Sequence, residues 1–171
     1  MLTRLMTPYQ VAVATEAVAA SVLAHAGCDV SIQYGANQPG YDVIATKGQH
    51  ALKVSVKGSQ DGGWGLIRSY KRGASYAEAA EAWRRGQRPD IVFCLVQYQG
   101  VIPGAAPRMY FAWPAEISTQ LKAARGGLGN TILYEHYVFK KGEAAGKTDK
   151  LPDSWWASSQ RIAELFARIQ H

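Results

Sequence analysis

The chain has 171 residues, with 19 Lys and Arg against 13 Asp and Glu, and its formal net charge is +6. Because about 100–200 residues usually form one domain, we expect a single domain over residues 1–171, and a composition of 47% hydrophobic and 19% charged residues excludes disorder as the main state. The excess of cations favours an anionic partner such as nucleic acid, although an excess spread over the whole surface would only aid solubility.

The N-terminal apolar run, which ends near Ala24, superficially resembles a signal peptide, but polar residues interrupt it. We therefore interpret it as a helix of a cytoplasmic protein that does not insert into a membrane. Cys28 and Cys94 have no CxxC or Cys/His neighbour, which predicts two buried thiols in a reduced chain. The four histidines are scattered without metal-binding spacing, which argues against a zinc site.

The first predicted element is a helix from Thr7 to about Ala26. Its start, Thr7-Pro8-Tyr9-Gln10, is typical of a capping box with proline in the first turn, and Gly27 ends it. The helix is apolar nearly all round, so we expect it to be covered on more than one side. Its only acid, Glu16, shares a stripe with apolar residues, where a carboxylate needs a cation, a donor or a metal.

Three strands follow, predicted over residues 28–34, 41–46 and 51–57. Asp42 opens the second strand. Side chains alternate along a strand, so the third strand places three polar residues on one face: Lys53, Ser55 and Lys57.

The remaining elements complete an α/β pattern with a mixed sheet. Residues 58–73 form a glycine-rich basic loop, and 90–97 is a continuous apolar run typical of a strand covered on both faces. The other predicted elements are a helix over 75–85, a strand over 108–113, a short helix after Pro114, one strand over 131–139 and a helix over 154–170. The core would span about residues 7–113, and 114–171 would be a C-terminal extension with its helix.

The chemistry centres on Asp42, because we expect a hairpin to bring it beside Ser55 and Lys57 and the first helix to place Glu16 over the same end of the sheet. A carboxylate pair would hold Mg²⁺ (or Mn²⁺), which activates water against a phosphodiester, and an ammonium would stabilise the developing charge. The alternative is that Asp42 caps a turn and the lysines form a solvated strand face.

The run Glu16 … Tyr41-Asp42-Val43-Ile44-Ala45 … Lys53-Val54-Ser55-Val56-Lys57-Gly58 resembles the PD-(D/E)xK nuclease superfamily over about residues 7–97. The resemblance implies a restriction-endonuclease-like α-β-β-β-α-β core, with a central mixed sheet flanked by helices. It also implies that Asp42 binds metal, that Lys57 is the active-site lysine, and that Glu16 is the first-helix glutamate of the resolvase-like branch.

The chain departs from this family at Ser55, where Glu, Asp or Gln is usual, and serine is a poor Mg²⁺ ligand. Some restriction enzymes with serine there recruit a glutamate from the next helix, which would be Glu78 or Glu81 here. Otherwise the site is degenerate and binds without cutting. Each glutamate taken singly is typical of a solvated helix face.

The candidate nucleic-acid contacts lie on the third strand and in the basic loop: Lys53, Arg68, Lys71, Arg72 and Trp64. The cations would contact phosphates and Trp64 would stack on an unpaired base, unless the loop aromatics pin the loop to the core. A second basic cluster is interpreted as a flexible surface loop with backbone contact: Lys140, Lys141, Lys147 and Lys150.

These patterns predict a Mg²⁺-dependent endonuclease that hydrolyses DNA. The alternative is a degenerate module of the same fold that binds DNA or a protein without cutting, and a third is an α/β domain whose basic charge has no nucleic-acid meaning. Double-strand cutting would require a homodimer, with an apolar surface around Trp156 and the last helix as the place to look. Trp155 is expected on the apolar face of that helix, with Trp156 partly exposed.

Overall fold

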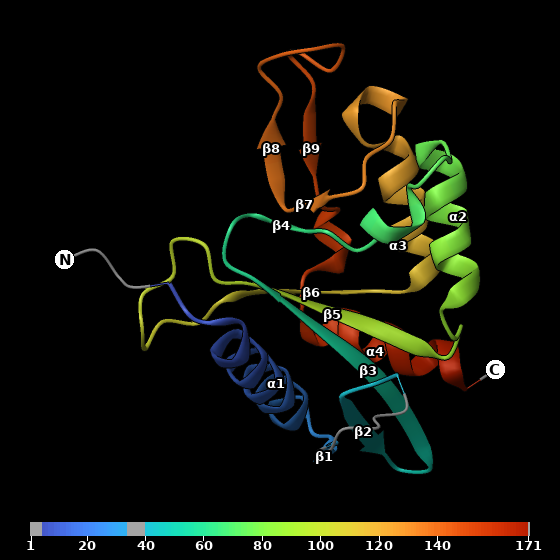
Figure 1. Ribbon diagram of the computed structural model, residues 1–171. Coiled ribbons are helices and arrows are strands. Elements are labelled where there is room, and N and C mark those ends of the chain that lie inside the picture. Colours follow the sequence, from blue (N-terminus) through green and yellow to red (C-terminus); the bar gives the residue numbers. More distant parts are fainter. Residues whose placement is uncertain (1–4, 34–39, 171) are drawn as a thin grey trace.

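The computed structural model describes residues 5–33 and 40–170 and is built on a five-stranded mixed sheet of order β1-β2-β3-β5-β6 (Figure 1). The strands are β1 Asp29–Ile32, β2 Val43–Lys47, β3 His50–Ser59, β5 Ile91–Gln97 and β6 Arg108–Ala112. Strands β3 and β5 are parallel and the other neighbours are antiparallel. The helices are α1 Pro8–His25, α2 Tyr76–Gly86, α3 Pro114–Ala123 and α4 Ser159–Ile169. The predicted α/β class and its α-β-β-β-α-β core are confirmed. The part of the predicted first strand at Tyr34 lies outside the described residues.

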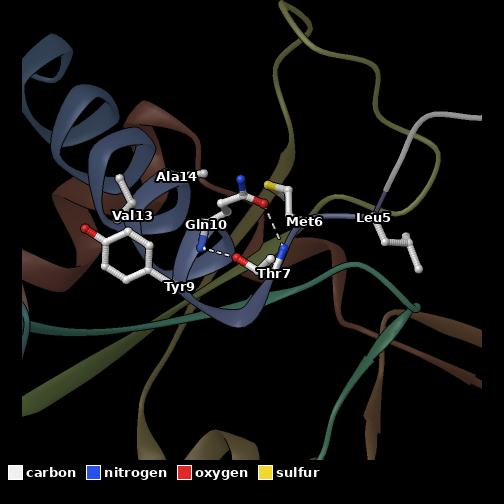
Figure 2. Close-up of a pocket in the computed structure, with 7 residues that line it drawn as sticks. All are labelled: Leu5, Met6, Thr7, Tyr9, Gln10, Val13 and Ala14. Carbon is white, nitrogen blue, oxygen red and sulfur yellow. Dashed lines mark hydrogen bonds between the residues drawn. The ribbon is translucent and has the colours of Figure 1, made fainter.

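Helix α1 begins at the predicted capping box. The backbone N–H of Gln10 donates to Thr7 Oγ1 at 3.2 Å, and the backbone N–H of Thr7 donates to Gln10 Oε1 at 2.9 Å (Figure 2). After His25 the chain turns at Gly27, whose φ of 86° lies in the left-handed region that glycine adopts without strain.

One side of α1 packs on the sheet, where Ala19 and Leu23 are fully buried. Tyr9 and Val13 lie on the outer side and are 78% and 50% exposed. Against the described residues the helix therefore buries one side only, contrary to the expectation from its composition. No helix in the described ranges is long and apolar enough to cross a bilayer.

Helices cover both faces of the sheet, which explains the continuous apolar run of β5. On one face Val92, Cys94 and Val96 pack with residues of α1 and α4, and on the other Phe93 and Leu95 pack with residues of α2 and α3. All seven residues of β5 are buried, as predicted.

The predicted single strand over 131–139 is wrong in detail, because the structure has two short strands there, one on each side of Glu135. Strand β7 (Leu133–Tyr134) pairs with β4 (Gly63–Trp64), and β8 (His136–Val138) pairs with β9 (Thr148–Lys150). The Glu135 carboxylate accepts hydrogen bonds from Arg108 Nε at 2.7 Å and from Tyr110 Oη at 2.7 Å. These bonds to β6 hold the residue at which one short sheet ends and the next begins.

The final helix starts later than predicted. Residues Asp153–Trp155 form a 3₁₀ turn, and Ser158 caps α4 by accepting from the backbone N–H of Arg161 at 3.0 Å. The segment between them is held along β6 by the bond from Ala157 N to Met109 O. Trp155 is consequently buried with α2 and α3 rather than on the apolar face of α4. Trp156 is 48% exposed, as expected.

Candidate active site

Asp42 lies one residue before β2 and is tied to β3 by two hydrogen bonds. Its backbone N–H donates to Val54 O at 2.9 Å, and its Oδ2 accepts from the backbone N–H of Val56 at 2.6 Å. Among described residues, none donates a hydrogen bond to Oδ1. The carboxylate therefore fixes the end of the β2–β3 hairpin with one oxygen and keeps the other available.

Glu16 brings a second carboxylate to this end of the sheet from α1. The side chain is half-buried, and its pKa is raised above the ordinary value, first by loss of solvent and then by the negative charge of Asp42. Neither carboxylate forms an ion pair within residues 5–33 and 40–170. The charge of Asp42 thus acts on Glu16, and neither acid is ion-paired with a described residue.

Lys57 supplies the positive charge of the site. It is exposed on β3 and forms no ion pair with the described acids. Together with Glu16 it lines an open groove of about 500 Å³ between the start of α1, the end of β3 and the segment that contains β4. The opposite wall is fixed because Trp64 Nε1 donates to the backbone O of Lys57 at 3.0 Å.

Gly58 sets the spacing between Glu16 and Lys57, a role that the sequence analysis missed. A Cβ at this position would clash with Thr15 Oγ1 and with Val11 Cγ1. Only glycine lets α1 approach β3 this closely, at a point one residue from Lys57 in sequence and beside Thr15, the neighbour of Glu16. The available signal was a glycine inside a predicted strand, which often marks close backbone approach.

Ser55 is buried on the face of the sheet that α2 and α3 cover, and it is not among the described residues that line the groove. It is 4% exposed and pairs in register with Phe93 of β5. Its hydroxyl is neutral, so it brings no further negative charge to the two carboxylates.

The structure does not bring Glu78 or Glu81 to this groove, whose described lining residues come from α1, β3 and the segment that contains β4. Glu78 closes a capping box with Ser75, whose backbone N–H it accepts at 2.7 Å, and this bond lowers the pKa of the carboxyl. Glu81 binds Arg84 and, at 2.9 Å, Lys122 of α3, and these partners lower its pKa to about 2. Among described residues, no three His, Cys, Asp or Glu side chains form a metal-binding group.

The residues predicted to contact nucleic acid differ in their exposure and in whether they already have a partner. Trp64 is 3% exposed, so its ring is not available to stack on a base. The structure supports the other predicted role, in which the ring pins the loop to the core. Lys53 pairs with Asp90 at 3.0 Å, and Lys71 donates to Ala74 O at 2.7 Å. Arg68 and Arg72 remain exposed.

A second groove, at the start of α1, has no charged side chain among the described residues that line it. It is lined by Leu5, Met6, Thr7, Tyr9, Gln10, Val13 and Ala14 (Figure 2). Acid–base and phosphate chemistry needs ionisable groups. The groove that contains Lys57 and Glu16, on which the charge of Asp42 acts, is therefore preferred to this one as the candidate site.

The two carboxylates fit a hard divalent cation. Mg²⁺ is commonly held by one or two protein carboxylates and keeps several waters, so a third acid is not obligatory. The acids repel one another, Asp42 keeps one oxygen available, and Glu16 borders an open groove. Comparisons with family models, curated proteins and solved structures found no match, so this fit is argued from the residues themselves.

Proposed function

We propose that this protein is a Mg²⁺-dependent nuclease (Mn²⁺ would also serve) that hydrolyses phosphodiester bonds in DNA. The observation that supports it is that the charge of Asp42, just before β2, acts on Glu16 of α1, and that Glu16 and Lys57 of β3 line one groove. Glu16 and Asp42 would hold the ion, which would supply positive charge that acidifies a water and neutralises the phosphate.

The side chains of the protein would each have a separate role in the reaction. Asp42 is positioned by the Val56 N–H, so its second oxygen has a fixed direction. The unpaired ammonium of Lys57 would bind a phosphate oxygen and stabilise the charge that develops on it. Ser55, buried and neutral, would make at most a water-mediated contact.

A DNA-binding or protein-binding module that does not cut is the second candidate. It is favoured by Ser55 in place of an acid and by the bonds that engage Glu78 with Ser75 and Glu81 with Arg84 and Lys122. A degenerate site would keep the fold and the cations and lose the chemistry.

The cellular location and the oligomeric state belong to the same proposal. Cys28 and Cys94 are free and buried, which suits the reducing cytoplasm. Cutting both strands of a duplex would require two copies, and the exposed ring of Trp156, edge-on to Tyr110 at 5.4 Å, is where we would look for their contact.

Nicking of supercoiled plasmid tests the two candidates. The nuclease predicts nicking with Mg²⁺ or Mn²⁺ that EDTA abolishes and that falls about 100-fold or more in Asp42→Ala and Lys57→Ala. Lys47→Ala, which removes an exposed lysine at the far end of β2, is the matched control and should nick normally. DNA binding without nicking, unchanged by EDTA, would support the module, and no DNA binding at low salt would contradict both.

A further inference from the structure

The strands β8 and β9 form a hairpin that projects from the body of the molecule (Figure 1). All three residues of β8 are exposed. The short β4–β7 pair lies between this hairpin and the main sheet (Figure 1). The hairpin is therefore a surface feature attached beside the groove wall.

Three aromatic rings are clustered at the base of the hairpin. Tyr134 and Tyr137 stack with ring centroids 4.4 Å apart and planes 18° from parallel, and Phe139 lies 4.8 Å from Tyr137 at 65°. Tyr137 is nevertheless 43% exposed. A ring that its neighbours already hold in place loses little further freedom when a ligand stacks on it.

Lys140 and Lys141 follow Phe139 directly in the chain, whereas the stem of Lys147 lies against Gly126. Lys140, Lys141 and Lys147 are exposed and form no ion pair with described residues. Burial raises the pKa of Tyr134, the charge of Arg68 in the basic loop opposes this effect, and the charges of Asp61 and Asp149 add to it.

The hairpin acids, Glu143 and Asp149, offset only part of the charge of its four lysines. Asp149 is buried and accepts a hydrogen bond from the backbone N–H of Arg125 at 2.8 Å, so it points inward. Glu143 is the remaining acid of the hairpin and lies in its loop. A surface that combines a part-exposed ring with unpaired lysines favours bases and phosphates together.

The rings adjoin the candidate active site directly. Gly63 lines the groove with Glu16 and Lys57, and it pairs in register with Tyr134. A Cβ on Gly63 would lie 3.0 Å from Tyr134 Cδ1, so the ring packs against the groove wall itself. A strand with one phosphate at Lys57 would reach Tyr137 by crossing this wall.

We infer that the β8–β9 hairpin binds an unpaired DNA strand, with Tyr137 stacked on a base and Lys140 and Lys141 on phosphates. Bases within a duplex are already stacked on one another, so an exposed ring offers little to continuous double-stranded DNA. Resting on the proposed function, this inference gives the substrate class as DNA with a single-stranded flap, gap or overhang.

Fluorescence anisotropy with labelled oligothymidylate and a duplex of equal length, both in EDTA, measures binding apart from cleavage. We expect the single strand to bind more tightly. Tyr137→Ala and Tyr137→Leu should weaken single-strand binding by about 5- to 150-fold, and Tyr137→Phe should preserve it. Tyr9→Ala removes a tyrosine that is 78% exposed on α1 and is the matched control.

The salt dependence of single-strand binding tests whether Lys140 and Lys141 contact phosphates. Each phosphate contact to a single strand contributes about 0.7 to the slope of log K against log salt, so the double variant Lys140→Ala/Lys141→Ala should reduce that slope by about 1.4. Lys47→Ala should leave it unchanged.

Normal single-strand binding by Tyr137→Leu would overturn the inference, as would tighter binding to duplex that ignores every Tyr137 variant. Loss of binding in Tyr137→Leu with an unchanged melting temperature excludes misfolding as its cause. Binding that depends on Tyr137 in a protein that never nicks DNA would refute the nuclease and leave the hairpin assignment intact. Nicking of tailed DNA by Tyr137→Leu at the normal rate would refute the hairpin assignment and leave the nuclease intact.

Discussion

The Asp42 carboxylate accepts a 2.6 Å hydrogen bond from the backbone N–H of Val56. This bond connects the residue before β2 to the middle of β3, and it directs a charged group toward Glu16 of α1. The same carboxylate thus has a structural and an electrostatic role. The two roles can be separated because an amide oxygen accepts a hydrogen bond without carrying a charge.

Asp42→Asn should therefore fold nearly normally and lose the electrostatic role. Asp42→Ala leaves the Val56 N–H without its acceptor and should lower the free energy of unfolding by about 1–2 kcal/mol. Urea unfolding of both variants measures the difference. Equal stability of Asn and Ala variants would show that the bond contributes little.

The raised pKa of Glu16 predicts a specific pH dependence of stability. The folded protein holds this proton more tightly than the unfolded chain, whose value is near 4.5. The contribution of this proton to the free energy of unfolding is therefore complete below the unfolded pKa, and it is lost as the pH rises through the folded pKa. Glu16→Gln should match the natural protein near pH 4 and be at least as stable near pH 7.

Urea unfolding at the two pH values measures this effect, and Glu143→Gln, in an exposed loop, is the control. A loss of stability in Glu16→Gln at the higher pH alone would contradict the sign, because it would mean that the ionised carboxylate is favoured by folding.

Metal binding should relieve the repulsion between Glu16 and Asp42. At about ten times its dissociation constant, Mg²⁺ should stabilise the fold by about 1.4 kcal/mol. Thermal unfolding with increasing Mg²⁺ measures this, and the stabilisation should vanish in Asp42→Asn. A similar stabilisation of that variant would place the ion elsewhere.

Local patterns predicted the parts of the site that depend on local structure. The capping box at Thr7 fixed the start of α1, and the β2–β3 hairpin placed Asp42 opposite Ser55. Strand alternation and the apolar run of β5 depend on the same short-range rules.

Contacts between distant segments could not be predicted in this way. Lys122 binds Glu81 from 41 positions away, which engages an acid considered for the site. The burial of Trp64 and Trp155 depends on α2 and α3, and the division of the chain at Glu135 depends on Arg108. Each of these outcomes requires the packed fold and leaves no periodic signal in the sequence.

The buried Trp64 predicts an effect on stability rather than on DNA affinity. Trp64→Phe keeps an aromatic ring in the core and removes the N–H that binds Lys57 O. We expect a loss of about 1 kcal/mol in the free energy of unfolding and little change in the dissociation constant for DNA. A large loss of DNA affinity in a fully folded Trp64→Phe would restore its base-stacking role.

The close approach at Gly58 predicts that a single methyl group will disturb the site. Gly58→Ala places its Cβ against Thr15 and Val11, so α1 must shift on β3 and carry Glu16 with it. We expect a cost of about 1–3 kcal/mol in the free energy of unfolding and a large loss of nicking. Gly86→Ala is the control, because its Cβ meets only the hydroxyl of the exposed Tyr70 side chain at 3.2 Å. Normal nicking by a destabilised Gly58→Ala would show that the distance between Glu16 and Lys57 does not limit the reaction.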